Sequence, residues 1–263
     1  CLWMCDFMHG PQVTVNRKTY KAILCAIIDD HTRMIVGHGF ARTETVLSLN
    51  LVLKSAFLAF GFPERLYVDN GASFSSDFLA KTCALPGISL IHSKPYDSPS
   101  RGKIERFFRT VRDRFLSTIT EKPTLDELNM LFAAWMNDDY HHKLHTGINE
   151  RPIDRYHRSC NHTHIVRPTK AELDEIFLVR HERMVNNDAT ISFKGNIYEA
   201  PTAYIRQRVD IRHPADADQE LYLYDKDIRV CRLKFVDKRQ NAKTFKPYQT
   251  HTPISYANGR VQQ

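Results

Sequence analysis

The chain has 263 residues, of which 42% are hydrophobic and 25% are charged; Lys and Arg number 37, Asp and Glu number 30, and the net charge at pH 7 is +7. The apolar fraction excludes an intrinsically disordered protein. A membrane-spanning helix is also excluded, because the longest apolar candidate, residues 46–62, contains Ser48, Asn50 and Lys54 and none approaches about 18 uninterrupted apolar residues. The positive balance favours a polyanionic partner, although weakly.

Six cysteines lie along the chain without paired spacing, at positions 1, 5, 25, 83, 160 and 231. Several lie in apolar runs, where free cysteine packs as a small apolar residue. We therefore expect a reducing compartment and no disulfide framework. The first residue is not methionine and lies in an apolar run, which is typical of a piece of a longer protein.

The first part of the chain predicts strands followed by helices. In chain order we expect strands at 2–8, 21–29 and 34–40, a helix at 43–60, a strand at 65–68, a helix at 75–83 and a strand at 88–91. The polar residues between the second and third strands predict an antiparallel hairpin. Thr43 and Thr45 are the candidate N-caps of the first helix.

Two amphipathic helices are expected next. Ser98 is a favourable N-cap and Pro99 suits the first helical position. Apolar residues at helical spacing follow, while the opposite face of this helix carries Arg101, Glu105, Arg109 and Arg112. The second helix is expected over residues 125–140.

The remaining chain predicts a second, smaller domain. Residues 141–170 are rich in His, Arg, Pro and Asn, and we expect a linker over 146–180, with a short helix or extended lead-in at 171–179. Short alternating segments separated by turn residues then predict a small β-barrel at 181–237. The predicted organisation is a catalytic core at 1–145, this linker, this barrel, and an irregular tail at 238–263.

Three acidic residues lie where an active site would need them. Asp6 lies at the end of the first apolar strand, Asp69 follows the fourth strand, and Glu105 lies on the polar face of the long helix. Neighbouring carboxylates repel one another and are favoured when a hard cation neutralises them. Mg²⁺ takes oxygen ligands, and two such ions can clamp the attacking and leaving oxygens of a phosphoryl displacement.

The surrounding motifs resemble the integrase core of retroviral integrases and bacterial insertion-sequence transposases. The motifs are WMCD (3–6), IIDDHTR (27–33), VDNG (68–71) and GKIERFFRT (102–110), with 35 residues between Asp69 and Glu105. HTG (145–147) and the Arg-Pro pair at 151–152 resemble the segment after the core in bacterial members. FKGNIY (193–198) resembles the C-terminal domain of the phage Mu transposase group. The resemblance therefore favours the bacterial insertion-element branch.

The resemblance implies an α/β, RNase H-like fold with a five-stranded mixed sheet flanked by helices, followed by a small all-β barrel. It implies a transposase or integrase that cleaves DNA ends and transfers strands, as a two-metal-ion polynucleotidyl transferase. Asp6, Asp69 and Glu105 carry over as catalytic metal ligands for two Mg²⁺ or Mn²⁺ ions. By position, the DNA-contacting residues are Lys103, Arg106, Arg109 and Arg101.

The same resemblance sets the expected partners. These are element ends and target DNA, with a dimer or tetramer of the chain on DNA, because cutting and joining two ends requires at least two active sites. No organic cofactor and no membrane contact are expected. The expected location is the cytoplasm of a bacterium, in association with the nucleoid.

Several alternatives stand beside this interpretation. Asp29 and Asp30 are rival metal ligands, but a hairpin turn over residues 30–33 is favoured. The histidines between His141 and His164, with Cys160, invite a zinc site, but their spacing does not match a zinc finger, and solvated histidines are favoured. Two roles are open for the predicted barrel: it is expected either to bind the DNA backbone or to mediate oligomerisation. The rival functions are an RNase H-like nuclease without strand transfer and an inactive DNA-binding relic, since the family's N-terminal DNA-end-recognising domain is not among these residues.

Overall fold

The computed structural model describes residues 1–93, 98–160, 165–215 and 217–236. It divides into two compact units, one formed mainly by Cys1–Val179 and the other mainly by Arg180–His213 and residues from Asp218 onward. The first unit has an apolar cluster on each face of its sheet, and the second unit has one cluster. No helix in the described ranges has both the length and the apolarity to cross a membrane.

The first unit is built on a five-stranded mixed sheet with the strand order β3-β2-β1-β4-β5. Its strands are β1 (Leu2–Val15), β2 (Lys18–Asp29), β3 (Ile35–Ala41), β4 (Arg65–Val68) and β5 (Ser89–His92). The first three strands pair antiparallel, whereas β4 pairs parallel with both β1 and β5. The predicted five-stranded mixed sheet is therefore confirmed.

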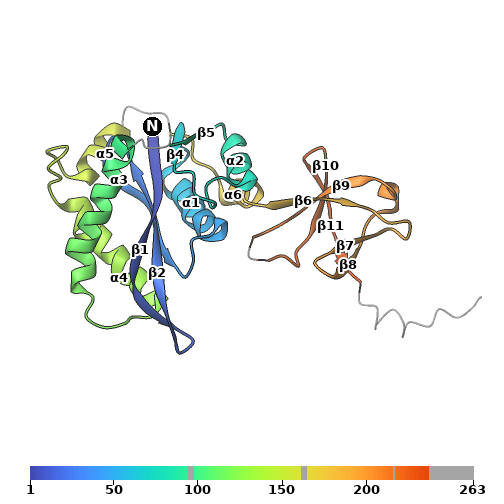
Figure 1. The fold of residues 1–263 in the computed structure, drawn as a ribbon. Helices are drawn as coiled ribbons and strands as arrows, with labels where there is room; N and C mark the ends of the chain where they lie inside the picture. Colours follow the sequence, from blue (N-terminus) through green and yellow to red (C-terminus); the bar gives the residue numbers. More distant parts are fainter. Residues whose placement is uncertain (94–97, 161–164, 216, 237–263) are drawn as a thin grey trace, which may run out of the picture. The chain divides into compact units, whose positions relative to one another are not determined.

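Helices cover both faces of this sheet (Figure 1). One face carries α1 (Val46–Phe60) and α2 (Asp77–Ala84), and the other carries α3 (Ser98–Thr110) and α4 (Leu125–Asp138). Along β2, Cys25 and Ile27 pack with α1, while Leu24, Ala26 and Ile28 pack with α3 and α4. Because successive side chains of a strand point to opposite faces, burial on both faces explains the unbroken apolar run in β2.

Side-chain caps fix where the helices begin. The Thr45 hydroxyl accepts a hydrogen bond from the Ser48 amide, so α1 begins at Val46 and Thr45 is the N-cap of the two candidates. Thr124 and Glu127 form a reciprocal capping box at the start of α4. These local signals were available in the sequence, and the expected helices at 43–60 and 125–140 are confirmed in position.

Two strands extend beyond their predicted bounds, β1 at its end and β2 at its start. Strand β1 continues to Val15 and pairs with β2 across a tight turn, in which Asn16 and Arg17 have φ values of 48° and 61°. The prediction ended at residue 8 because polar residues and a register shift between His9 and Gln12 interrupt the strand pattern. After α3 the chain continues through a π-helical turn, Val111–Phe115, and a 3₁₀ turn, Leu116–Thr118.

The predicted linker over 146–180 is wrong, although the short helix expected at 171–179 is present as the second of two helices. This segment contains α5 (Pro152–Cys160) and α6 (Lys170–Ile176), and the first unit continues to Val179 rather than ending at residue 145. Ile153 and Tyr156 of α5 pack against the α1 side of the core, and Leu173 is fully buried there. Only a few apolar residues make these contacts, and the surrounding His, Arg and Asn residues concealed them in the sequence.

The second unit consists of short strands, as predicted. They are β6 (Val179–Met184), β7 (Thr190–Phe193), β8 (Asn196–Glu199), β9 (Arg208–His213), β10 (Tyr222–Asp225), β11 (Ile228–Arg232) and β12 (Lys234–Phe235). The described strands pair as two sheets, β11-β10-β9-β6 and β12-β8-β7, around one apolar cluster, rather than as one closed barrel. The predicted tail at 238–263 lies outside the described residues.

Polar side chains from α4 and the turn after it bind the outer edge of strand β3. The Asn129 side chain accepts from the Phe40 N–H at 2.7 Å and donates to the Phe40 carbonyl at 3.0 Å. The Ile35 N–H donates to Nε2 of His141 at 3.3 Å. Buried backbone groups need such partners, so these contacts attach α4 to the sheet.

Acid should weaken this attachment through His141. Burial lowers the pKa of His141 to about 4, below its ordinary value of 6.5. As the pH falls, the unfolded chain therefore takes up a proton before the folded chain does. The stabilisation is complete above about pH 6.5 and is lost as the pH falls towards 4. We expect this residue to reduce the free energy of unfolding by about 2 to 3 kcal/mol over that range.

Urea denaturation at pH 7.5 and 4.5 would measure this loss. His38 is partly buried, and this burial lowers its pKa, so the unfolding free energy of the wild type and of the variants also falls in acid through His38. The decisive quantity is the difference in pH dependence between the wild type and His141→Gln. His142→Gln, at an exposed neighbouring site, is the matched control. An H141Q variant with the same pH dependence as the wild type would contradict the prediction.

Candidate active site

The parallel pairing of β1 and β4 brings Asp6 and Asp69 together. Met4 of β1 lies opposite Tyr67 of β4, and each aspartate lies two residues further along its chain in the same direction. Asp6 is 7% exposed and shares a sheet face with Met4 and Met8, against which α3 packs. Asp69 follows the last residue of β4. The two carboxylates therefore meet beside the end of β4, near the middle of the sheet and beneath α3.

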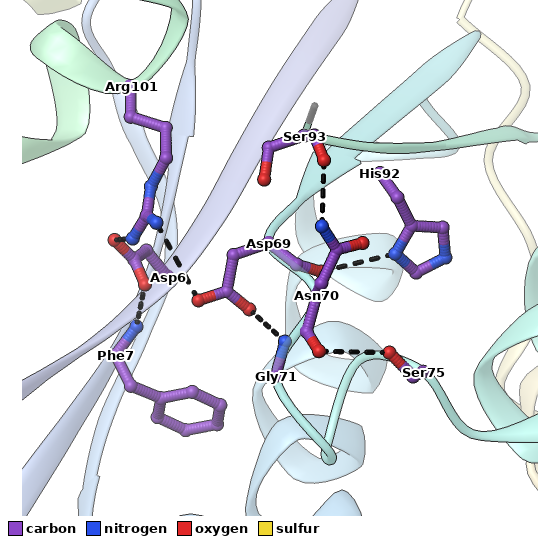
Figure 2. Close-up of polar contacts among 9 residues, drawn as sticks. All are labelled: Asp6, Phe7, Asp69, Asn70, Gly71, Ser75, His92, Ser93 and Arg101. Carbon is purple, nitrogen blue, oxygen red and sulfur yellow. Dashed lines mark hydrogen bonds and ion pairs between the residues drawn. The ribbon is translucent and has the colours of Figure 1, made fainter. Parts of the chain in front are cut away.

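A guanidinium group joins these two carboxylates. Arg101, in α3, places Nη2 at 2.5 Å from Oδ2 of Asp6 and Nη1 at 3.8 Å from Oδ2 of Asp69 (Figure 2). The Arg101 side chain is 30% exposed, so water still reaches the pair. The sequence analysis assigned Arg101 to DNA. In the structure it binds the acidic pair instead, an arrangement that residue spacing alone did not indicate.

Backbone amides orient both carboxylates independently of Arg101. The Phe7 N–H donates to Oδ1 of Asp6 at 2.8 Å, and the Gly71 N–H donates to Oδ1 of Asp69 at 2.8 Å (Figure 2). Gly71 has little room for a larger residue, because a Cβ there would lie 2.9 Å from Oδ1 of Asp69. A larger residue at this position would therefore push the Asp69 carboxylate out of its place.

The loop after β4 is tied to the end of β5. The Asn70 side chain donates to the Ser93 carbonyl at 2.8 Å, and Nδ1 of His92 lies 3.1 Å from the Asp69 carbonyl, to which it donates. The Ser75 hydroxyl donates to the Asn70 carbonyl at 3.2 Å (Figure 2). These contacts hold the backbone of Asp69 on a fixed frame.

Burial and charge act in opposite directions on Asp6. Burial raises the pKa of Asp6, while the hydrogen bond and charge of Arg101 and the Phe7 amide lower it. Burial is the larger effect, so the net pKa is raised. An adjacent cation therefore favours the charged form of an aspartate in this position.

Glu44 is a nearby acidic residue that sequence reasoning missed. A Cβ placed on Gly71 would lie 3.6 Å from Oε1 of Glu44, so this carboxylate lies beside the turn that holds Asp69. Burial raises the pKa of Glu44, and the charges of Asp69 and Asp6 raise it further. In the sequence, Glu44 precedes the N-cap Thr45 and carries no other signal.

Glu105 does not join the acidic pair in this structure. It is exposed on α3, one turn after Arg101, and its charge acts on the Arg101 guanidinium. In the described part of the chain, no group of three His, Cys, Asp or Glu side chains converges in a geometry that could hold a metal ion. The structure thus assembles two of the three predicted ligands.

The basic residues of α3 have different surroundings. Lys103 donates to Asp30 at 2.5 Å, so its charge is paired with a hairpin aspartate. A Cβ placed on Gly147 would lie 3.7 Å from Nη1 of Arg106, so the Arg106 side chain lies beside Gly147. Arg106 and Arg109 are both exposed. Of the predicted DNA contacts, these two present their charge to solvent most openly.

Asp29 and Asp30 belong to the hairpin between β2 and β3. The Asp29 carboxylate accepts from the Thr32 amide at 3.1 Å and from the Thr32 hydroxyl at 2.5 Å. Arg33 has a φ of 63° and donates its N–H to the Asp29 carbonyl. The favoured interpretation of this segment as a turn is therefore confirmed.

The predicted solvated histidines include one that is not solvated. His141 is 5% exposed and is bound to the edge of β3, so it is a structural core residue. His142 is exposed, and Nδ1 of His145 accepts from the Gly147 amide at 3.1 Å. His162 and His164 lie outside the described residues.

Acidic partners neutralise much of the basic surface of the second unit. Ion pairs in the described residues join Arg180 and Arg212 to Asp227, Arg208 to Glu182, and Lys194 to Asp218. The Arg212 guanidinium also lies 3.9 Å from the centroid of the Tyr224 ring. Because these side chains are already paired, they give little support to strong DNA-backbone binding by this unit.

The donor set fits a hard divalent cation. Asp6 and Asp69 present carboxylate oxygens to one shared positive group, and their orientation is fixed by backbone amides. Mg²⁺ typically uses one or two carboxylates together with water and substrate phosphates. The acidic pair would therefore offer two carboxylate ligands to one such ion, and in this structure the Arg101 guanidinium contacts the same two carboxylates.

Family models match most of the chain. Two models, each described as an integrase core domain, match residues 1–98 and 86–152, and the Mu transposase C-terminal model matches residues 174–232. The transposase of transposon Tn552 from Staphylococcus aureus is 28% identical over 231 residues, covering 79% of this chain and 48% of that protein.

More distant relatives include a retrovirus-related Pol polyprotein from transposon gypsy of Drosophila melanogaster. It is 25% identical over 138 residues, covering 51% of this chain and 13% of the polyprotein. The chain thus spans less than half the length of these curated relatives.

Two solved structures share the fold. The catalytic core domain of BIV integrase has a TM-score of 0.50 and 20% identity, covering 61% of this chain and 96% of that one. A chain of the simian T-cell lymphotropic virus intasome in complex with PP2A regulatory subunit B56 gamma has a TM-score of 0.50 and 17% identity, covering 90% of this chain and 78% of that one. The sheet, the family models and the Tn552 relative agree: the chain joins an integrase core domain to a Mu transposase C-terminal domain and belongs to the integrase-core family of transposases and integrases, on the bacterial insertion-element side.

Proposed function

We propose that this chain is a metal-dependent polynucleotidyl transferase that cleaves DNA ends and joins them to target DNA. The observation that carries the proposal is that Asp6 and Asp69 both contact the Arg101 guanidinium, beside the end of strand β4 in an integrase-core sheet. The Tn552 relative is a transposase, which supports the same reaction class.

The proposed reaction has two in-line displacements. Water first attacks a phosphodiester at the element end, and the 3′-oxygen of that end leaves as a free 3′-OH. This 3′-OH then attacks a phosphodiester of the target, forms a new bond to the target phosphorus and displaces the 3′-oxygen of the target strand, which leaves as a 3′-OH. Two Mg²⁺ or Mn²⁺ ions bound at the site would activate the attacking oxygen and stabilise the leaving oxygen. The Phe7 and Gly71 amides orient the carboxylates of Asp6 and Asp69, which carry negative charge at the site. Glu105 would complete the ligand set by approaching from α3.

DNA is the proposed partner, with the phosphate backbone along the exposed face of α3. Arg106 and Arg109 are the first proposed contacts because both are exposed. Lys103 and Arg101 would contribute once they leave Asp30 and Asp6. Assembly as a dimer or tetramer on DNA, and a cytoplasmic, nucleoid-associated location in a bacterium, belong to the same proposal.

An end-joining assay tests the reaction class. The chain is incubated with Mn²⁺, a supercoiled plasmid and a labelled duplex pool that has a free 3′-OH and randomised terminal bases. Sequencing of joined products would demonstrate strand transfer and identify the preferred ends. Nicking without joining would instead support a nuclease, and DNA binding without either reaction would support the relic interpretation. Omission of the metal is the control.

A further inference from the structure

The contact between Arg101 and the acidic pair has a consequence for metal binding. One guanidinium binds both carboxylates, with nitrogen–oxygen distances of 2.5 Å to Asp6 and 3.8 Å to Asp69. It therefore lies between the two oxygen ligands that a divalent ion at this site would use. A metal ion and the Arg101 side chain cannot hold these oxygens at the same time.

The acidic pair needs a cation whether or not metal is present. Like charges this close repel, and Asp6 is buried, so its charged form is poorly solvated. Glu44 and Glu105 add negative charge at the turn beside Asp69 and on α3. One guanidinium offsets only part of the charge of these four carboxylates, so the site attracts further cations even when Arg101 is bound.

The two carboxylates do not depend on Arg101 for their orientation. The Phe7 and Gly71 amides donate to Oδ1 of Asp6 and Oδ1 of Asp69, whereas Arg101 contacts the Oδ2 atoms. Removal of the guanidinium therefore leaves each carboxylate held by a backbone donor. The side chain of Arg101 is also partly exposed, which gives it room to leave.

We propose that Arg101 is an internal counter-ion that occupies the cation position between Asp6 and Asp69 and that divalent metal displaces, so that it sets the metal affinity of the site. This inference rests on the proposed function, because it takes the acidic pair as the metal site. Arg101 is a positioning residue in this role. It offsets the charge of the pair without metal and lowers the affinity for the first ion.

Mn²⁺ titration of the full chain without DNA tests the competition, by calorimetry or by the electron paramagnetic resonance signal of free Mn²⁺. Arg101→Gln keeps a polar side chain but removes the charge. We expect its Mn²⁺ affinity to rise about tenfold over the wild type, the factor for loss of one charge-assisted hydrogen bond. Arg101→Lys, which keeps the charge but cannot bind both carboxylates through one planar group, should lie between the two.

Thermal unfolding gives a second readout. Without metal, R101Q should melt below the wild type because the acidic pair loses its cation, and saturating Mn²⁺ should raise its melting temperature by more than that of the wild type. Arg112→Gln, an exposed position about three turns further along in the π-helical turn after α3, is the matched control and should match the wild type in both measurements.

The outcomes separate this inference from the proposed function. Equal or weaker Mn²⁺ binding by R101Q, with wild-type binding intact, would overturn the counter-ion role and leave the metal site standing. If Asp69→Asn binds Mn²⁺ as well as the wild type does, or if neither the wild type nor R101Q binds it, the acidic pair is not a metal site. The proposed function and the inference would then fail together.

Discussion

Asp69→Asn should reduce end joining by at least about a thousandfold, the equivalent of several kcal/mol of transition-state stabilisation lost with a metal ligand. The substitution keeps the shape of the side chain and still offers an oxygen to the Gly71 N–H, so the loop after β4 should keep its conformation. The substitution removes the negative charge of the Asp69 carboxylate, which lies next to Asp6. The readout is the rate of formation of joined product in the end-joining assay.

A matched control distinguishes this effect from the loss of any one acidic side chain. Asp77→Asn changes an exposed aspartate in the first turn of α2 and should leave the joining rate within about twofold of the wild type, as most surface substitutions do. The two variants should have similar melting temperatures. An Asp69→Asn protein that is folded and still joins ends at a comparable rate would remove Asp69 from the catalytic site.

Phe132→Ala should cost about 3 to 5 kcal/mol of the free energy of unfolding, the range for a fully buried aromatic side chain. Phe132 is 0% exposed, and its ring packs edge-to-face against Phe40 and Phe115 with centroids 5.2 and 5.0 Å away. It therefore joins α4 to the sheet and to the end of the long helix. Truncation to alanine leaves a cavity between α4, the sheet and the end of the long helix, and these elements cannot move together to fill it.

Urea denaturation followed by tryptophan fluorescence would measure this loss. Trp3 and Trp135 both lie in the first unit, so the signal reports on that unit rather than on the second. Met130→Ala, on the same helix at a site 65% exposed, should change the unfolding free energy by less than about 0.5 kcal/mol. Similar losses for the two variants would show that burial does not determine the stability of α4.

The pairing of Asp6 with Asp69 could be predicted because it depends on the backbone. Two apolar strands, each followed or interrupted by an aspartate, place the carboxylates together once the strands are parallel neighbours. The hairpin turn at Asp29 and the N-cap at Thr45 could likewise be predicted, because both depend on contacts within a few residues.

The contacts of Arg101 and Glu44 could not be predicted in the same way. Arg101 reaches across from α3 to a strand 95 positions earlier in the chain, and its choice of partner depends on side-chain geometry and local charge. Glu44 approaches Asp69 only because the turn after β4 lies beside the start of α1. Helix α5 was missed for another reason, since its few apolar residues lie among His, Arg and Asp residues in a segment whose composition favoured a linker.

The attachment of Asn129 to Phe40 also limits how copies of this chain can associate. A strand at the border of a sheet normally exposes N–H and C=O groups that pair readily with a strand from another molecule. At Phe40 both groups are bound by one side-chain amide, and at Ile35 the N–H is bound by His141. Two copies therefore cannot extend the sheet continuously across β3. Copies of the chain would therefore have to associate through other surfaces. The same side-chain contacts protect this edge strand against aggregation by strand pairing.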